Sequence, residues 1–417
     1  MLDANKQKIL QYIDANQERL IQFLQEIVTI PSDNPPGNCH QIAHFIQRRL
    51  CEFGFEDASF LAVSPEEAAA VSQIEGANVI ASSTFGDGTG LEIALNAHGD
   101  VVPPGLGWTE DPYGGKNVDG KIYGRGAAVS KSDIASYTFA ALALRQVARD
   151  LNGRVVLAFN FDEETGGMIG PKWLIHNNYI RPDLAIAAGF THSITNAHNG
   201  CLHLEIKTIG KSAHAAVPYT GHDALEAMTA VLLALYDYRR SLSDIHSSVE
   251  GIDSPSLVVG LIKGGTNTNV VPDECVIRLD RRIIPEENAE VVEAMIRDVV
   301  EQAVKPFPGI KIEIKRILLA SNLGPIAKDS RLVRTLATNW SELMGGEPPI
   351  EGVPLYTDAR HFAEAGVPVV MFGAGPRTLE EANGHRADEH VKIDDLINAT
   401  KIVACTLYDL LQSGETL

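Results

Sequence analysis

The chain has 417 residues, of which 45% are hydrophobic and 21% are charged, and its formal net charge is −19. This composition is that of folded globular proteins, and the length predicts two or three domains. A negative charge of this size repels nucleic acid and anionic membranes, so we expect neither as a partner. No apolar run reaches the roughly 18 residues of a spanning helix. Five scattered cysteines without a CxxC pair favour reduced thiols in a cytoplasmic protein.

Helices and strands alternate along the first 199 residues. Apolar residues recur at helical spacing in several segments, and continuous apolar runs between them predict buried strands. The expected helices are 3–29, 40–53 and 131–149. The expected strands are 91–97, 155–161 and 184–188. This alternation predicts an α/β fold with a mostly parallel sheet and helices on both of its faces.

The segment 200–318 has a different pattern and is predicted to be an inserted domain. Its expected elements are a strand at 202–209, a helix at 224–242, strands at 256–263 and 275–284, a helix at 287–304 and a strand at 310–318. This β-α-β-β-α-β order is the signature of a ferredoxin-like α+β domain. The α/β pattern then resumes with helices at 329–344 and 392–413 and a strand at 367–372. We therefore expect residues 1–199 and 319–417 to form one discontinuous domain.

Polar side chains follow two of the predicted strands directly. His98 and Asp100 follow the first, and Glu163 and Glu164 follow the second. Ligands of open α/β sheets bind outside the carboxyl ends of the strands, so these residues face the predicted crevice. An imidazole backed by a carboxylate, opposite two adjacent carboxylates, predicts a metal-assisted hydrolase.

The motifs of this chain resemble in combination those of a known family, the zinc metallopeptidases and deacylases. That family includes aminoacylase, acetylornithine deacetylase, succinyl-diaminopimelate desuccinylase and glutamate carboxypeptidase. The resemblance runs from PSDNPPGN to ADEHVKIDDL and rests on LNAHGDVVP, DGKIYGRGAA, DEETGG, GKSAHAAVP, GGTNTNVVPDEC, TDARHFAEAGVPVVMFGAG and GHRADEH. It implies a catalytic α/β domain in two pieces, with segment 200–318 as a lid through which the chain forms a homodimer.

The resemblance also implies roles for individual residues. His98, Glu164 and His385 resemble metal ligands, and Asp100 resembles the carboxylate that fixes the tautomer of the ligand histidine. Glu163 resembles the general base that takes a proton from water on the metal ion.

Three residues of the predicted lid resemble substrate-contacting groups of the family. His214 is similar to a lid histidine that enters the site of the neighbouring subunit and stabilises the developing oxyanion. Asn269 and Arg282 lie where the family holds a substrate carboxylate, for which a bidentate guanidinium is suited.

The chain departs from the family pattern at two positions. The family usually has a bridging Asp where this chain has Val129, and a carboxylate where it has Phe190. A desolvated carboxylate without its cation is costly, and two apolar replacements avoid that cost. We therefore expect one divalent ion, either zinc, manganese or iron, and loss of the second site. Asp133, one helical turn beyond Val129, is the substitute ligand that the sequence offers.

The expected activity is hydrolysis of an amide bond in a small carboxylate-bearing molecule, such as an N-acyl amino acid or a short peptide. A second hypothesis is a hydrolytic deaminase of an aromatic amino acid-like compound, because Phe190 adds an apolar wall beside the metal. A third is a catalytically weakened binding relative. Release of ammonia would favour the deaminase, whereas retention of Glu163 together with the predicted ligands argues against a binding protein.

Overall fold

The computed structural model describes residues 3–412 and divides the chain into two compact units. Unit 1 comprises the described residues up to Asn196, Ile326–Ile350 and those from Thr357 onward. Unit 2 comprises Ala197–Pro325 and Glu351–Tyr356. The inserted segment predicted at 200–318 lies within unit 2. Unit 2 also includes the short segment Glu351–Tyr356.

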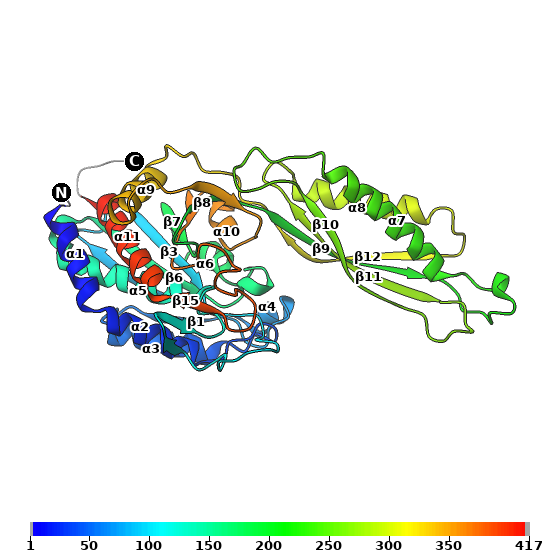
Figure 1. Cartoon of the computed structure of the whole chain (residues 1–417), viewed down its shortest axis with the longest axis horizontal. Helices are drawn as coiled ribbons and strands as arrows, with labels where there is room; N and C mark the ends of the chain where they lie inside the picture. Colours follow the sequence, from blue (N-terminus) through cyan, green and yellow to red (C-terminus); the bar gives the residue numbers. More distant parts are fainter. Residues whose placement is uncertain (1–2, 413–417) are drawn as a thin grey trace. The chain divides into compact units, whose positions relative to one another are not determined.

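Most of unit 1 is built on a sheet that has eight strands among residues 3–412, in the order β1-β2-β6-β3-β7-β14-β8-β13 (Figure 1); the end of β8 and all of β13 except Ile350 are counted in unit 2. The strands are β1 (Ser59–Ala62), β2 (Ala77–Phe85), β6 (Gly153–Asn160), β3 (Glu92–His98), β7 (Leu184–Ala187), β14 (Val369–Met371), β8 (Ile194–His198) and β13 (Ile350–Val353). The central strands β6, β3, β7 and β14 run parallel, whereas β1, β2 and β8 form antiparallel pairs. The predicted α/β fold with a mostly parallel sheet is confirmed, and antiparallel strands flank its parallel centre.

The helices of unit 1 are α1 (Ala4–Ala15), α2 (Gln17–Val28), α3 (His40–Glu52), α4 (Pro65–Ala70), α5 (Lys131–Leu144), α6 (Pro171–His176), α9 (Arg331–Met344), α10 (Ala359–Glu364) and α11 (Ile393–Leu411). Helices are found at the predicted positions 40–53, 131–149, 329–344 and 392–413, although α5 ends at Leu144 and a 3₁₀ helix follows it at Arg145–Asp150; the short helices α4, α6 and α10 were not predicted. The prediction of a single helix at 3–29 is wrong, because the helix is interrupted at Asn16. The side-chain amide of Asn16 donates a hydrogen bond to the main-chain carbonyl of Tyr12. Among residues 3–412 no helix has the length and apolar character to cross a membrane.

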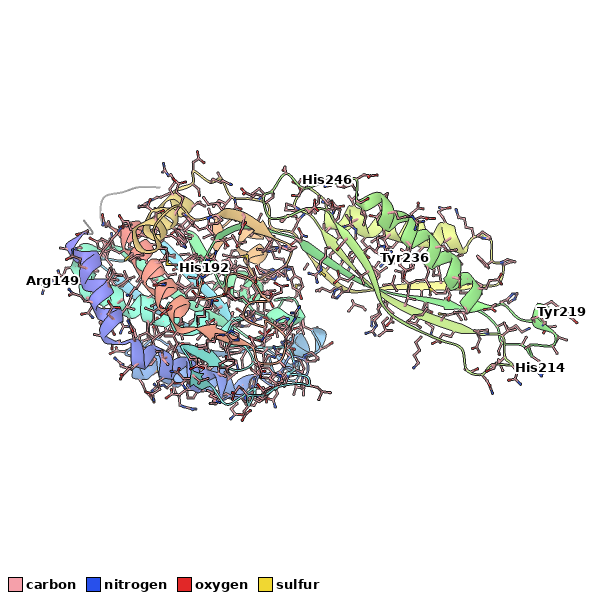
Figure 2. All side chains as sticks on the ribbon, viewed as in Figure 1. Arg149, His192, His214, Tyr219, Tyr236 and His246 are labelled. Carbon is pink, nitrogen blue, oxygen red and sulfur yellow. The ribbon has the colours of Figure 1, made fainter. Side chains whose placement is uncertain are left out.

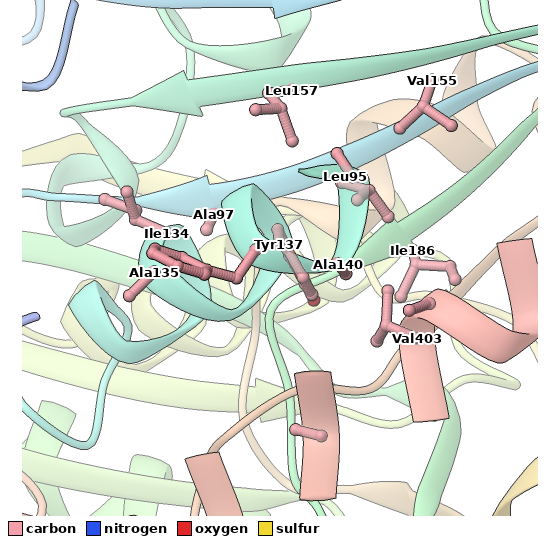
Figure 3. Close-up of a cluster of buried hydrophobic side chains, with 14 of the residues drawn as sticks. Leu95, Ala97, Ile134, Ala135, Tyr137, Ala140, Val155, Leu157, Ile186 and Val403 are labelled. Atoms are coloured by element: carbon pink, nitrogen blue, oxygen red, sulfur yellow. The ribbon is translucent and has the colours of Figure 1, made fainter. Parts of the chain in front are cut away.

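Helix α5 is the central helix of unit 1. All of its residues are buried, including the polar residues Lys131, Ser132, Asp133, Ser136 and Thr138. Figure 3 shows its side chains, among them Ile134 and Ala140, beside Leu95 of β3, Ile186 of β7 and Val403 of α11. This packing fixes the strands behind the site, so the residues just past their carboxyl ends are held on a rigid support.

A small sheet is formed by two strands of the segment between β3 and α5 and one strand from the segment before α11. It consists of β4 (Lys116–Val118), β5 (Lys121–Tyr123) and β15 (His390–Lys392), paired in the order β15-β5-β4. The pairing of β15 with β5 joins the segment that precedes α11 to the glycine-rich segment that follows β3. Residues 384–389 are thereby held next to the residues that lead into α5.

Unit 2 has the predicted β-α-β-β-α-β order. Its elements are β9 (Gly200–Ile209), α7 (Ala224–Leu242), β10 (Ser256–Gly264), β11 (Glu274–Ile283), α8 (Ala289–Val304) and β12 (Lys311–Ala320). The strands form an antiparallel sheet in the order β10-β11-β9-β12, and α7 and α8 lie on one face of it (Figure 1). Alternate residues of β9 and β11 point into the core beneath these helices, and the residues between them lie on the opposite face.

Candidate active site

The site is assembled where β3 and β6 end next to each other. These strands are parallel neighbours, and their register places His98 opposite Asn160. Residues that follow the two strands therefore lie at the same edge of the sheet. Ligand atoms of His98, Glu163 and Glu164 all lie within 4.8 Å of one another. The structure thus brings together the two strand ends that the sequence analysis selected.

Asp100 holds both halves of this cluster in place. Its carboxylate accepts hydrogen bonds from the main-chain N–H groups of Glu163 and Glu164 at 3.3 and 3.1 Å, and from Asn34 Nδ2 at 2.8 Å. His98 Nδ1 lies 3.0 Å from the carbonyl oxygen of Asp100 and 3.3 Å from its carboxylate Oδ1. A proton on Nδ1 leaves the lone pair on Nε2, which is the form in which histidine binds a metal.

His385 reaches the same cluster from the loop before β15. Its Nε2 lies 3.3 Å from Oε1 of Glu164. That Oε1 is buried, and His385 is within ion-pair distance of it, but no hydrogen bond of good geometry reaches it from residues 3–412. A buried carboxylate oxygen without a donor is costly unless a cation takes the place of the donor. Imidazole and carboxylate donors at these distances are those that bind zinc, manganese or iron, so the residues present fit a divalent ion.

The protonation of the cluster reflects its burial and its excess of carboxylates. Burial raises the pKa of Glu163 well above its usual range, although the nearby His98 opposes this. Burial disfavours the charged form of His98, but Asp100 and the two glutamates outweigh it and raise the pKa of His98 well above 6.5. The Glu164 carboxylate raises the pKa of His385. The cluster therefore attracts positive charge, which a divalent ion would supply in place of protons.

Glu389 positions the loop that leads into α5, a role that the sequence analysis did not assign. Its buried carboxylate contacts Arg125 Nη1 at 2.5 Å and accepts from the main-chain N–H groups of Gly126, Ala128 and Val129 at 3.0 to 3.3 Å. The next residue, Ser130, exchanges hydrogen bonds with the main chain of His98. Val129 is therefore held next to His98, one of the predicted metal ligands.

Asp358 is a second residue that the sequence analysis missed, although it lies in the TDARHFAEAGVP motif. Its Oδ2 accepts a hydrogen bond from Asn160 Nδ2 at 2.5 Å, and its Oδ1 packs so closely on Gly167 that a Cβ there would lie 2.0 Å away. Arg360 Nη2 donates to the carbonyl oxygen of Gly166. The segment that begins α10 thus supports the turn after Glu163 and Glu164. In the sequence, Asp358 stands two residues before the Arg360–His361 pair.

Asp133 and Phe190 lie at the ends of neighbouring elements. Asp133 is buried in the first turn of α5, and its Oδ1 accepts from the main-chain N–H of Ala374 at 2.6 Å. It is not part of the metal-binding group that His98 forms among the described residues. Phe190 follows β7 and pairs with Gly375 in an isolated parallel bridge. Both positions border the loop region that follows β14.

The remaining predicted residues lie in unit 2. His214 is exposed in the loop after β9, near Tyr219 (Figure 2), and its Nδ1 accepts from the N–H of Ala216 at 3.0 Å. Asn269 is exposed in the segment between β10 and β11. Its main-chain carbonyl accepts a hydrogen bond from the N–H of Ala215. Arg282 lies at the end of β11, with its Nε 3.0 Å from Asp280 Oδ1.

Comparison with known proteins identifies the family. Residues 94–409 match the peptidase family M20/M25/M40. The chain belongs to this family. It is 30% identical over 340 residues to the acetylornithine deacetylase of Myxococcus xanthus, a match that covers 79% of this chain and 83% of that protein.

Two solved structures have the same fold. Human carnosine dipeptidase 1 superimposes with a TM-score of 0.76 at 20% identity, covering 98% of this chain and 99% of that one. A dinuclear metal binding peptidase of the M20 family from Bacillus subtilis has a TM-score of 0.66 at 18% identity, covering 95% and 99%. The prediction of a metal-dependent hydrolase that cleaves amide bonds in small substrates is confirmed.

Proposed function

We propose that this M20 enzyme hydrolyses the amide bond of an N-acyl amino acid or a short peptide with one divalent ion per active site. The observation that carries this proposal is the group formed by His98, Glu163 and Glu164, with His385 in contact with Glu164. His98, Glu164 and His385 would hold the ion, which polarises a substrate carbonyl and acidifies water when bound. Glu163 is then the carboxylate left to act as the base.

The proton-transfer role of Glu163 follows from its position and its burial. It is adjacent in sequence to the proposed ligand Glu164, and its carboxylate lies within 4.8 Å of the ligand atoms of His98 and Glu164, so it would lie beside an ion held by them. Burial raises its pKa well above the usual range, which makes the carboxylate a stronger proton acceptor than an exposed glutamate. Glu163 takes the proton of the attacking water and delivers it to the nitrogen of the leaving amine.

The proposal of one ion is supported by the residues around His98. Val129, held beside His98 through Ser130, has no group that could bridge two ions. Phe190 is also apolar, and the Asp133 carboxylate already accepts a hydrogen bond from Ala374. Two-metal sites hold their ions about 3.5–4 Å apart through shared carboxylates. Removal of such ligands leaves a two-histidine, one-carboxylate site with positions open for water and substrate.

We further propose that unit 2 is a lid and dimerisation domain. Arg282 and Asn269 would bind the substrate carboxylate, and His214 would act in the active site of a second copy. The exposure of His214 in its loop supports a role toward another molecule. Among residues 3–412, β10 and β12 are the edge strands of their sheet, and an interface between copies would cover those edges.

A substrate screen on the metal-loaded enzyme tests the proposed function. N-acetyl and N-succinyl amino acids and dipeptides are incubated with the enzyme, and the free amino group and free acid are quantified. We expect hydrolysis of carboxylate-bearing amides and much slower hydrolysis of the same compounds as methyl esters. Release of ammonia without a second carboxylic acid would instead identify the deaminase, and no turnover of any amide would contradict the proposal.

A further inference from the structure

A second group of metal-binding side chains lies in unit 2, on the sheet face opposite α7 and α8. Strands β9 and β11 are antiparallel neighbours, with His203 opposite Asp280 and Cys201 opposite Arg282. Directly opposed residues point to the same face of a sheet, as do residues two apart on one strand. The side chains of Cys201, His203 and Asp280 therefore converge on one point, and their ligand atoms all lie within 4.8 Å of one another.

Cys201 and Asp280 both lie next to the same ring nitrogen of His203, Nε2. Cys201 Sγ lies 3.2 Å from His203 Nε2, and Asp280 Oδ2 lies 2.8 Å from the same Nε2. Cys201 Sγ and Asp280 Oδ2 are 3.7 Å apart. In a nucleophile relay, the imidazole uses one nitrogen for the nucleophile and the other for the orienting carboxylate. This triangle lacks that arrangement, because a single nitrogen faces both groups.

The triangle has the dimensions of a metal site. Zinc binds thiolate sulfur at about 2.3 Å, imidazole nitrogen at about 2.0–2.1 Å and carboxylate oxygen at about 2.0–2.2 Å, so tetrahedral ligand atoms are roughly 3.3–3.6 Å apart. The three observed separations lie within about half an ångström of that range. Sulfur, nitrogen and oxygen donors together select zinc over magnesium and calcium, which prefer oxygen ligands alone.

Arg282 is a charged neighbour of the triangle. Arg282 Nε lies 3.0 Å from Asp280 Oδ1, which leaves Oδ2 directed at His203. The guanidinium also interacts with Cys201.

Burial of the three side chains indicates how an ion would enter. Cys201 has no exposed surface, whereas the side chains of His203 and Asp280 are 36% and 30% exposed. The thiolate thus forms the floor of the site, and the imidazole and carboxylate form its rim. We propose that unit 2 binds a second zinc ion through Cys201 Sγ, His203 Nε2 and Asp280 Oδ2, with water as the fourth ligand. This ion joins β9 to β11, and its ligands are distinct from His98, Glu164 and His385.

Cobalt substitution distinguishes the two sites, because only the proposed one contains sulfur. The full-length enzyme is stripped with a chelator and titrated with Co²⁺, and near-ultraviolet absorption from cobalt–thiolate charge transfer is recorded. We expect this band in the wild-type protein and its loss in Cys201→Ser. Cys51→Ser, which changes an exposed thiol in α3, is the matched control and should keep the band.

A second variant and a metal count complete the test. His203→Gln changes a partly exposed side chain, so it serves if Cys201→Ser does not fold. After saturation with Zn²⁺ and gel filtration, each of these variants should contain one zinc ion fewer per chain than the wild type. Absence of the charge-transfer band at saturating Co²⁺ would overturn the proposal, as would its persistence in Cys201→Ser. Neither result would bear on the catalytic ion, whose proposed ligands contain no sulfur.

Discussion

The carboxylate of Asp100 accepts a hydrogen bond from the main-chain N–H of Glu164 at 3.1 Å while its main-chain carbonyl lies 3.0 Å from His98 Nδ1. One residue therefore orients two proposed metal ligands that come from different strands. Because the two contacts use different groups of Asp100, replacement of its side chain affects the glutamate turn and the charge near His98 but leaves the carbonyl in place.

Asp100→Asn should weaken metal binding by about 10- to 100-fold, the usual effect of losing a partner of metal ligands. An amide offers one acceptor oxygen, whereas the carboxylate serves Glu163, Glu164 and Asn34. Metal affinity is measured by competition with a chromophoric chelator. Asp183→Asn is the control, since Asp183 also accepts a main-chain N–H, from Glu92, but lies exposed at the opposite end of the strands. Equal affinities of the Asp100 variant and the wild type would refute this role.

The catalytic site should hold one ion. To separate it from the zinc site proposed in unit 2, elemental analysis is done on Cys201→Ser, which should contain one ion per chain. His98→Ala added to that variant should remove the remaining ion. Two ions per chain in Cys201→Ser, together with full activity, would show that the second catalytic site is intact and would return Asp133 as its ligand.

Asp133→Asn should stabilise the metal-free protein at neutral pH. Burial raises the pKa of Asp133 to about 7, from the ordinary value of 3.8 that it has in the unfolded chain. The folded chain thus binds this proton more tightly, and the stability contributed by the group is full below pH about 4 and is lost as pH rises through about 7. Asparagine keeps an oxygen for the N–H of Ala374 and cannot ionise. The free energy of unfolding of Asp133→Asn relative to wild type should therefore increase as pH rises. The increase should be up to about 1.4 kcal/mol for each unit by which folding shifts the pKa.

Denaturant unfolding of both proteins at pH 4 and pH 8 measures this gain. Asp87→Asn provides the opposite sign, because hydrogen bonds from Thr89 lower the pKa of Asp87, and its loss should destabilise the protein at the higher pH. A difference between Asp133→Asn and wild type that does not change with pH would contradict the assignment.

If His214 acts in the site of a second copy, two inactive variants should complement each other. In a mixture of His214→Ala and Glu163→Gln chains, each heterodimer has one site with both defects and one site with neither. Statistical exchange within a two-fold dimer then restores about a quarter of the sites. If His214 acts within its own chain, every site keeps a defect. No recovery of activity despite demonstrated subunit exchange would exclude the role in a partner.

The sequence predicted the parts of the site whose signal is local. His98, Glu163 and Glu164 directly follow apolar strands, and parallel pairing of β3 with β6 brings those strand ends together. Glu389 and Asp358 were missed because their roles depend on contacts with distant segments, the loop at Gly126 and the end of β6 at Asn160. No pattern within either local sequence specifies those contacts.

The fold prediction failed where local side-chain contacts or edge strands decide the structure. Apolar periodicity continues through residues 3–29, but Asn16 bonds to Tyr12 and divides the helix. Strands β1 and β2 were not predicted, and their antiparallel pairing at one edge of the sheet is set by neighbours rather than by a connecting helix. The order of elements in unit 2 was predicted because its strands alternate clearly and its helices are amphipathic.

The most direct test of the account is the turnover and metal content of Glu163→Gln, measured on the same sample. Glutamine keeps the shape of the side chain but cannot accept a proton, so kcat should fall by about 10²- to 10⁴-fold. Metal content should equal that of the wild type, since Glu163 is proposed as the base and not as a ligand. Glu66→Gln, on the exposed face of α4, should change neither quantity. An unchanged kcat in Glu163→Gln would contradict the mechanism, and loss of the metal with loss of activity would make Glu163 a ligand instead.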